Sequence, residues 1–276
     1  FDARAELGEG PAWHAGEQVL YWVDILKKRI YRDAEAWLGL PDFPGCVAPR
    51  RGGGLIVALR SSVVEVDGQG GIKLRVAVNE PRGNRFNDGK CDPAGRFLAG
   101  TMDMAEKEDS GALYSLEGGR LRQLISGVRI SNGLAWSPDH RTFYYIDTPS
   151  RAIQAFDYSL ATGKITRGRI LVQIPPALGW PDGMTSDMDG NLWVAMWGGS
   201  QILKLEPLDG RVLEQIPLPV LQPTSCVFGG PGMKRLYITS ARKDLSASQL
   251  TQYPLSGSVF SVETEVTGMP TFEFAG

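Results

Sequence analysis

The amino-acid sequence repeats one pattern along its length, and this repetition constrains the fold more than any other feature. Each copy has a polar residue before Gly or Ser, then a polar turn, then runs rich in β-branched and aromatic residues. The polar residue falls at Asp88, Asn132, Asp182 and Thr224, which are spaced 44, 50 and 42 residues apart. Another copy begins near Glu9, 79 residues before Asp88, so one weaker copy fits between them.

Repeats of about 40 to 50 residues with about four short strands each are typical of β-propeller blades. The strand-like runs of the clearest copies are 97–101 and 112–116, 142–147 and 152–156, and 192–196 and 202–205. A barrel or sandwich would show no such copying. The sequence therefore predicts an all-β, six-bladed β-propeller with four-stranded antiparallel blades, formed by residues 1–276 as a single domain. In the weak second copy, the broken stretch from Asp33 to Cys46 predicts a truncated hairpin.

Composition excludes several classes of function. The formal net charge is −2 and the charges are scattered, so no basic stripe offers a footprint for nucleic acid. No apolar run reaches the roughly 18 residues of a transmembrane helix, so we expect no membrane partner. Cys46, Cys91 and Cys226 lie far apart, which favours reduced thiols in a cytoplasmic protein. A closed propeller needs no second chain, so we expect a monomer; the start at Phe1 leaves open whether a signal peptide has been removed.

Equivalent positions of successive blades converge in a propeller, because the first strand of each blade lines the central channel. Of the five equivalent residues, Thr224 is a hydroxyl, and four offer carboxylate or amide oxygens to a cation: Glu9, Asp88, Asn132 and Asp182. Crowded carboxylates raise each other's pKa, and a bound divalent cation removes that penalty. Oxygen ligands suit Ca²⁺, Mg²⁺ or Mn²⁺, with Zn²⁺ and Fe²⁺ as alternatives. Taken singly, each Asp or Asn before Gly is explained equally well as a turn residue.

Several short stretches carry a resemblance to a known family when they are taken together. They are Leu7–Trp13, Asn84–Lys90, Asp92–Arg96, Gly100–Met102, Ile130–Leu134 and Pro181–Met184. As a set they resemble the gluconolactonase/regucalcin (SMP-30) family, and the similarity runs nearly end to end. The resemblance implies a six-bladed propeller that binds one divalent metal ion in its channel. The metal ligands that it implies are Glu9, Asn132 and Asp182.

The same resemblance implies how a substrate is held. The family's substrate-binding Arg and Asn fall on Arg85 and Asn87, and Asp88 is expected near the substrate or a metal-bound water. Some family members place an acidic residue against the sugar a few positions after the Gly-Thr-Met motif. The alignment is ambiguous there, and Glu106 is our choice from the acidic residues Asp103, Glu106 and Glu108. This polar loop is either a solvated hairpin tip or a lid.

The expected activity is hydrolysis of a sugar lactone such as D-glucono-1,5-lactone to the aldonic acid. A divalent cation polarises the carbonyl and activates water, and Asp182 is the candidate catalytic base that takes the proton of that water. The alternative is a calcium-binding regulatory propeller without significant enzymatic activity. A propeller esterase would favour a more apolar channel with His near the metal, and nothing supports a particular protein partner. A Ser nucleophile is disfavoured, because His14 and His140 lie at the wrong ends of their repeats.

Aromatic residues divide into two groups. One group recurs at strand positions and predicts packing between blades: Trp13, Trp22, Trp136, Trp193 and Phe228. The other group does not follow the repeat. Trp180 directly precedes Pro181 and Asp182, and Trp197 ends a strand-like run, so either could form a wall of the substrate pocket.

Overall fold

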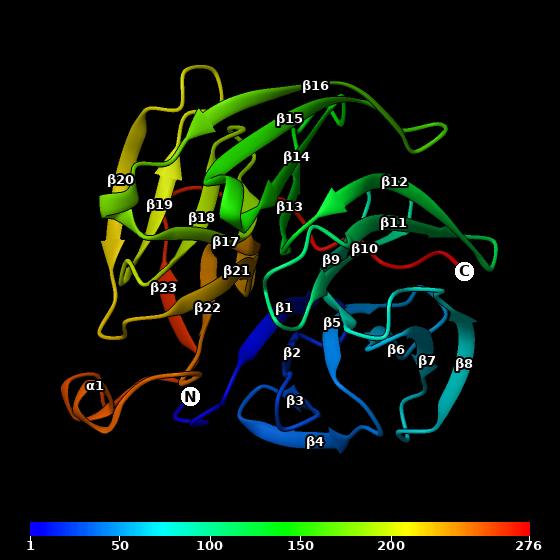
Figure 1. Ribbon diagram of the computed structural model, residues 1–276, viewed down its shortest axis with the longest axis horizontal. Helices are drawn as coiled ribbons and strands as arrows, with labels where there is room; N and C mark the ends of the chain where they lie inside the picture. Colours follow the sequence, from blue (N-terminus) through cyan, green and yellow to red (C-terminus); the bar gives the residue numbers. More distant parts are fainter.

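The strands assemble into six separate antiparallel sheets that surround a common channel (Figure 1). The structure is a computed structural model that describes residues 1–276. The first strands of successive blades, β1, β5, β9, β13, β17 and β21, contact one another in that order, and β21 returns to β1. The predicted six-bladed β-propeller is therefore confirmed. No helix in the structure combines the length and the apolar character that crossing a bilayer requires.

Each blade is a meander, because its strands follow the order of the chain. The first three blades contain β1 (Gly8–His14), β2 (Val19–Asp24), β3 (Arg29–Arg32) and β4 (Glu35–Gly39); β5 (Pro44–Pro49), β6 (Leu55–Leu59), β7 (Ser62–Val66) and β8 (Ile72–Ala77); and β9 (Asn84–Cys91), β10 (Phe97–Asp103), β11 (Gly111–Glu117) and β12 (Arg120–Val128). The last three contain β13 (Ser131–Trp136), β14 (Thr142–Asp147), β15 (Ala152–Ser159) and β16 (Lys164–Gln173); β17 (Trp180–Ser186), β18 (Leu192–Trp197), β19 (Gln201–Leu205) and β20 (Val212–Pro217); and β21 (Pro223–Gly229), β22 (Arg235–Ser240) and β23 (Phe260–Glu263). The helical segments are η1 (Thr148–Ser150), η2 (Pro176–Leu178), η3 (Pro231–Met233) and α1 (Ala247–Gln252).

The incomplete blade is the sixth, not the second. The prediction of a truncated hairpin between Asp33 and Cys46 was wrong, because this stretch supplies β4 to the first blade and the start of β5 to the second. The sixth blade has only three strands. After β23 the chain leaves the blade as a C-terminal tail, and Phe274 forms a parallel bridge with Arg50 of the second blade.

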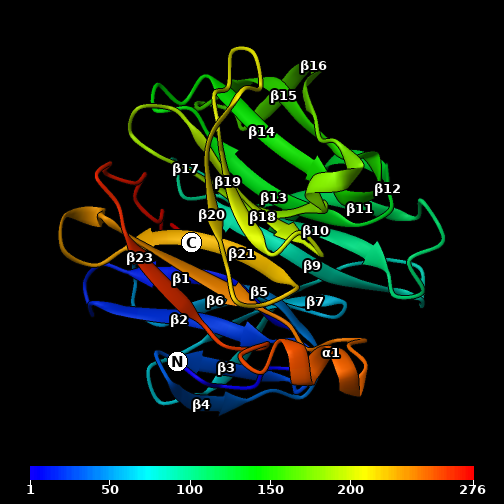
Figure 2. The same cartoon turned by 90° about the vertical axis from the view of Figure 1, so that its left-hand side faces the viewer.

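The C-terminal tail covers one end of the channel. Residues Met269 to Phe272 line a small cavity of about 50 Å³ together with the later residues of the innermost strands. Figure 2 shows this tail, in red, on the side of the molecule opposite to α1. A site that exchanges ligands with solvent therefore belongs at the other end, where the innermost strands begin.

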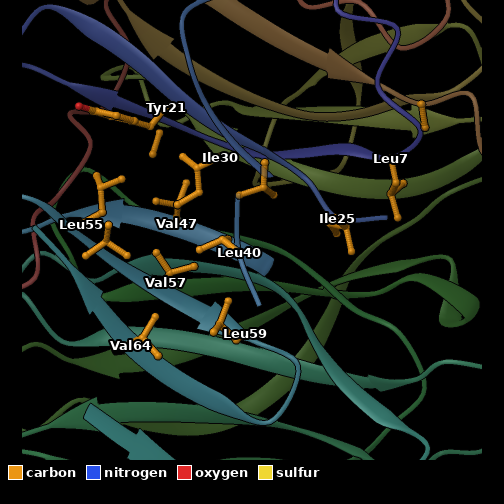
Figure 3. Close-up of a cluster of buried hydrophobic side chains, with 14 residues drawn as sticks. Leu7, Tyr21, Ile25, Ile30, Leu40, Val47, Leu55, Val57, Leu59 and Val64 are labelled. Carbon is orange, nitrogen blue, oxygen red and sulfur yellow. The ribbon is translucent and has the colours of Figure 1, made fainter. Parts of the chain in front are cut away.

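Apolar side chains between neighbouring blades form the core. One cluster joins Tyr21 and Ile30 of the first blade to Val47 and Val57 of the second (Figure 3). The recurring aromatic residues are all at most 5% exposed, and they pack across blade boundaries as predicted. Trp13, for example, stacks on Tyr237 of the sixth blade with ring centroids 5.5 Å apart. The three cysteines are free and buried.

Glycine permits the close approach of innermost strands. A Cβ on Gly45 would lie 2.5 Å from the carbonyl oxygen of Asn87 in the third blade. A Cβ on Gly183 would lie 2.0 Å from Ser225 Oγ in the sixth blade. Real Cβ atoms do not come so close to other heavy atoms, so larger residues at these positions would push adjacent blades apart.

We expect Gly45→Ala to reduce the free energy of unfolding by about 1–3 kcal/mol, the usual cost of overpacking a core. Urea denaturation measures this change. Gly39→Ala is the matched control, because no atom lies within 4 Å of a Cβ at that exposed strand position. The control should change the free energy by less than about 0.5 kcal/mol. Equal effects of the two substitutions would contradict the close approach of β5 and β9.

Candidate active site

Every innermost strand contains an irregularity near its start. The pairing of the first with the second strand of each blade shifts register at this point in all six blades. The shifts lie at or beside Glu9, Asn132 and Asp182. A β-bulge turns a side chain out of the regular alternation and often lies next to an active site. The repeated polar positions of the sequence are therefore the places where the strands depart from regular pairing.

The three expected metal ligands line one cavity. Glu9, Asn132 and Asp182 share a cavity of about 480 Å³ with Arg85 and Asn87. The residues come from four different innermost strands, β1, β9, β13 and β17. The volume lies within the range of about 300–1,000 Å³ that is usual for small-molecule sites.

Carboxylate charge is concentrated at this place. Burial raises the pKa of Glu9 from 4.5 to about 8, and the charge of Asp88 adds to the rise. Burial also raises the pKa of Asp182 well above its usual range, with further contributions from Glu9 and Asp88. Because three carboxyl groups act on one another within a buried site, a bound cation would stabilise all three in their ionised form.

The available donor atoms fit a divalent cation with oxygen ligands. Asp182 Oδ1 is buried and has no hydrogen-bond partner. Glu9 uses Oε2 to accept a bond from the backbone N–H of Gly10 at 3.0 Å. No group of three or more His, Cys, Asp or Glu side chains in the chain is arranged to hold a metal ion. The oxygen donors at this cavity are instead two carboxylates, those of Glu9 and Asp182, and the Asn132 amide. Oxygen donors of these types suit Ca²⁺, Mg²⁺ or Mn²⁺.

Arg85 and Asn87 lie beside these ligands and bond to each other. Arg85 Nη1 donates to Asn87 Oδ1 at 2.7 Å and to the Phe86 carbonyl at 2.9 Å. Asn87 Nδ2 donates to the Ser131 carbonyl at 2.8 Å and to Asn132 Oδ1 at 3.0 Å. Both N–H groups of the Asn87 amide therefore bond to β13, the neighbouring innermost strand. Arg85 Nε and Nη2 make no hydrogen bond within the protein, and burial lowers the pKa of Arg85 to about 10.

One known protein family matches most of this chain. A sequence profile of the SMP-30/gluconolactonase/LRE-like region matches residues 7–242.

This chain belongs to the SMP-30/gluconolactonase/LRE-like family.

Its relatives include regucalcin of Danio rerio, which is 39% identical over 98% of this chain and 95% of its own length. The 6-deoxy-6-sulfogluconolactonase of Pseudomonas putida is 40% identical over the same shares. The crystal structure of a calcium-binding protein, regucalcin, from Agrobacterium tumefaciens superimposes with a TM-score of 0.94 at 26% identity, over 99% of this chain and 95% of that one. A gluconolactonase from Xanthomonas campestris gives a TM-score of 0.72 at 26% identity, over 86% and 84%.

Asp88 differs from the expectation for a residue that contacts substrate. It is 2% exposed and is not among the residues that line the cavity. Its Oδ1 accepts a bond from the N–H of Gly89 at 2.7 Å, and Oδ2 is buried without a partner. The nearby Lys90 ammonium donates to the Met184 carbonyl and opposes the rise that burial causes in the pKa of Asp88. Asp88 therefore acts on the cavity through its charge, from behind the lining.

The acidic loop contributes one carboxylate to the rim of the cavity. Of Asp103, Glu106 and Glu108, only Glu106 lines the cavity. The Asp103 carboxylate instead accepts bonds from the backbone N–H groups of Ala105, Lys107 and Glu108, which hold its pKa below the usual value. Glu106 forms an ion pair of 3.0 Å with Lys243 of the sixth blade, so the loop is connected across the rim.

The cavity also contains residues that sequence reasoning missed. Thr148 and Lys243 line it, together with Trp180 and Trp197, which the sequence suggested as pocket walls. The strand order within each blade could have located Thr148 and Lys243 from the sequence. The second strand of each blade is antiparallel to the first, so it ends where the first begins. Thr148 directly follows β14 and Lys243 lies shortly after β22, which places both at the mouth of the channel.

We expect the chelator-treated protein to lose stability as the pH rises from about 4.5 to about 8. Glu9 holds its proton up to about pH 8 in the folded protein but only to about 4.5 in the unfolded chain. The folded state therefore binds more protons in this window, and stability decreases with pH. Glu9→Gln should flatten this decrease in scanning calorimetry, whereas Glu35→Gln, an exposed control, should not. An unchanged slope in Glu9→Gln would mean that Glu9 is not protonated in the folded state.

Proposed function

We propose that this protein is a lactonase that requires a divalent cation and opens a sugar lactone to the aldonic acid, with D-glucono-1,5-lactone as the first candidate substrate. One observation carries the proposal. Two buried carboxylates, an amide oxygen and a buried guanidinium from four separate strands meet in a cavity large enough for a sugar. The family contains gluconolactonases, which supports lactone hydrolysis as the reaction class.

Glu9, Asn132 and Asp182 would hold the cation. When bound there, it would polarise the lactone carbonyl and lower the pKa of water. Asp182 is the candidate base, because Oδ1 is buried in the site without any partner in the protein. A carboxylate with a free lone pair at this position can accept the proton of the attacking water and later return it to the ring oxygen that leaves.

Arg85 is the principal candidate for substrate contact. Its Nε and two hydrogens on Nη2 are available to bond the oxygens of a sugar, because only Nη1 is used within the protein. Asn87 lines the cavity, and its hydrogen bonds orient both Arg85 and Asn132. Glu106 at the rim can accept bonds from sugar hydroxyls when its ion pair with Lys243 opens. Trp180 and Trp197 offer apolar surface for the faces of the ring.

A calcium-binding regulatory propeller is the second candidate function. Regucalcin relatives and the calcium-binding name of one solved structure favour it. A site that only binds an ion needs little space beyond a few water molecules, each of about 30 Å³. The cavity of about 480 Å³ and the buried Arg85 exceed this requirement, so we place hydrolysis first.

The deciding experiment separates these functions. Chelator-stripped protein is supplied with Ca²⁺, Mg²⁺, Mn²⁺, Zn²⁺ or Fe²⁺ and assayed by pH-stat against glucono-, galactono-, xylono- and arabinono-lactones. Cation-dependent hydrolysis above the spontaneous rate supports the lactonase. Tight Ca²⁺ binding without hydrolysis of any lactone in the panel supports the regulatory protein instead.

We expect Asp182→Asn to lower kcat for the preferred lactone by about 10²- to 10⁴-fold, the usual contribution of general acid–base catalysis. Steady-state kinetics by pH-stat measures the change, and circular dichroism checks the fold. Asp209→Asn, on an exposed turn of the fifth blade, is the control and should retain the parent rate. Full activity in a folded Asp182→Asn variant would exclude the proposed base.

A further inference from the structure

A continuous series of hydrogen bonds crosses the candidate cation site from one blade to the next two. Arg85 donates to Asn87 Oδ1, and Asn87 Nδ2 donates to Asn132 Oδ1 at 3.0 Å. Asn132 Nδ2 then donates to Thr148 Oγ1 at 2.8 Å. Thr148 Oγ1 in turn donates to the Pro181 carbonyl at 2.8 Å. The series thus connects β9, β13 and β17, the strands that carry Arg85, Asn132 and Asp182.

The direction of this series is determined by its two ends. A guanidinium can only donate hydrogen bonds, and a backbone carbonyl can only accept them. Each amide in between must therefore accept on one side with oxygen and donate on the other side with nitrogen. For Asn132, this rule assigns Oδ1 to the side of Asn87 and Nδ2 to the side of Thr148.

Thr148 is the last side chain of this hydrogen-bond series, between Asn132 and the Pro181 carbonyl. It begins η1, directly after β14, and its half-buried side chain lines the cavity. Its single hydroxyl receives the Asn132 amide and bonds the residue that precedes Asp182. No other acceptor bonds Asn132 Nδ2 in the structure.

We infer that Thr148 is a positioning residue for the cation site, which it serves by keeping the Asn132 amide oxygen available as a ligand and by holding the start of β17 beside it. This inference rests on the proposed cation-dependent function. It assigns Thr148 no contact with the reacting atoms.

Loss of the hydroxyl removes the only acceptor of Asn132 Nδ2, so the amide is then held only by the bond that its Oδ1 accepts from Asn87. The side chain can turn about that remaining bond, which moves Oδ1 away from the position where it would bind a cation. Residues that orient metal ligands in this way typically account for about 10- to 100-fold in metal affinity. The bond to the Pro181 carbonyl is lost as well. Loss of one oxygen atom therefore affects both β13, which carries Asn132, and β17, which carries Asp182.

The test compares Thr148→Val, which keeps the shape and loses the hydroxyl, with Thr148→Ser, which keeps the hydroxyl. Mn²⁺ and Ca²⁺ affinities of the chelator-stripped full-length proteins are measured by titration calorimetry, and melting temperatures are measured without cation. We expect Thr148→Val to bind both ions about 10- to 100-fold more weakly and Thr148→Ser to bind as the parent does. Ser150→Ala is the local control, because this exposed hydroxyl of η1 bonds only near its own backbone.

The possible failures are distinguishable. If the parent binds Mn²⁺ or Ca²⁺ and Asp182→Asn does not, but Thr148→Val binds like the parent, the positioning role is wrong and the cation site stands. If Thr148→Ser or Ser150→Ala weakens binding as much as Thr148→Val, the effect comes from loop structure, and the inference is overturned. If the parent binds none of Ca²⁺, Mg²⁺, Mn²⁺, Zn²⁺ and Fe²⁺, the proposed function fails and this inference fails with it.

Discussion

The ring of blades depends on side-chain contact, because only isolated bridges, such as that of Met102 with Ile130, pair the backbone of one blade with that of the next. Burial of each Val, Leu, Ile or Phe between blades contributes about 1.5–3 kcal/mol. A single polar connection, such as the bond of 2.6 Å from Thr224 Oγ1 to the Gly8 carbonyl that closes the ring, contributes about 0.5–1.5 kcal/mol. Apolar contact therefore supplies most of the stability, and it requires the innermost strands to approach closely. Glycines such as Gly45 and Gly183 make that approach possible.

The same close approach creates the electrostatic character of the channel mouth. Register shifts beside the glycines turn the Glu9 and Asp182 carboxylates toward the cavity, and the buried Asp88 carboxylate lies behind its lining. Arg85 and Lys90 are the nearby cations, and burial disfavours their charged forms too. Protonated carboxyl groups or a bound cation can relieve this concentration of charge. The architecture that stabilises the ring thus also gathers carboxyl groups for which a bound cation and protons would compete.

Most strands and the convergence of the repeated positions could be predicted, because β-branched runs and a regular period are local signals. The location of the incomplete blade could not. The stretch from Asp33 to Cys46 and the chain after β23 both contain Gly and Pro, and only the paths of β4 and the C-terminal tail show which blade is incomplete. Asp88 illustrates a finer limit. Asn87 and Asp88 lie together in the register break of β9, and a shift of one residue exchanges the faces to which two neighbours point. The structure turns Asn87 to the cavity.

The sequence alone determined which residues occupy equivalent places around the channel, because a repeated fold maps equal positions in the chain onto equal positions in space. The repeat places Glu9, Asp88, Asn132, Asp182 and Thr224 around one channel, and the family resemblance implies which three of them would bind a cation. Only the tertiary structure decided that Glu106 is the loop carboxylate at the rim and that Thr148 receives the Asn132 amide. The Glu106 contact with Lys243 joins two blades, and the Asn132 contact with Thr148 joins β13 to the residue that follows β14 in the same blade. No local sequence pattern specifies which distant partner a polar group will choose.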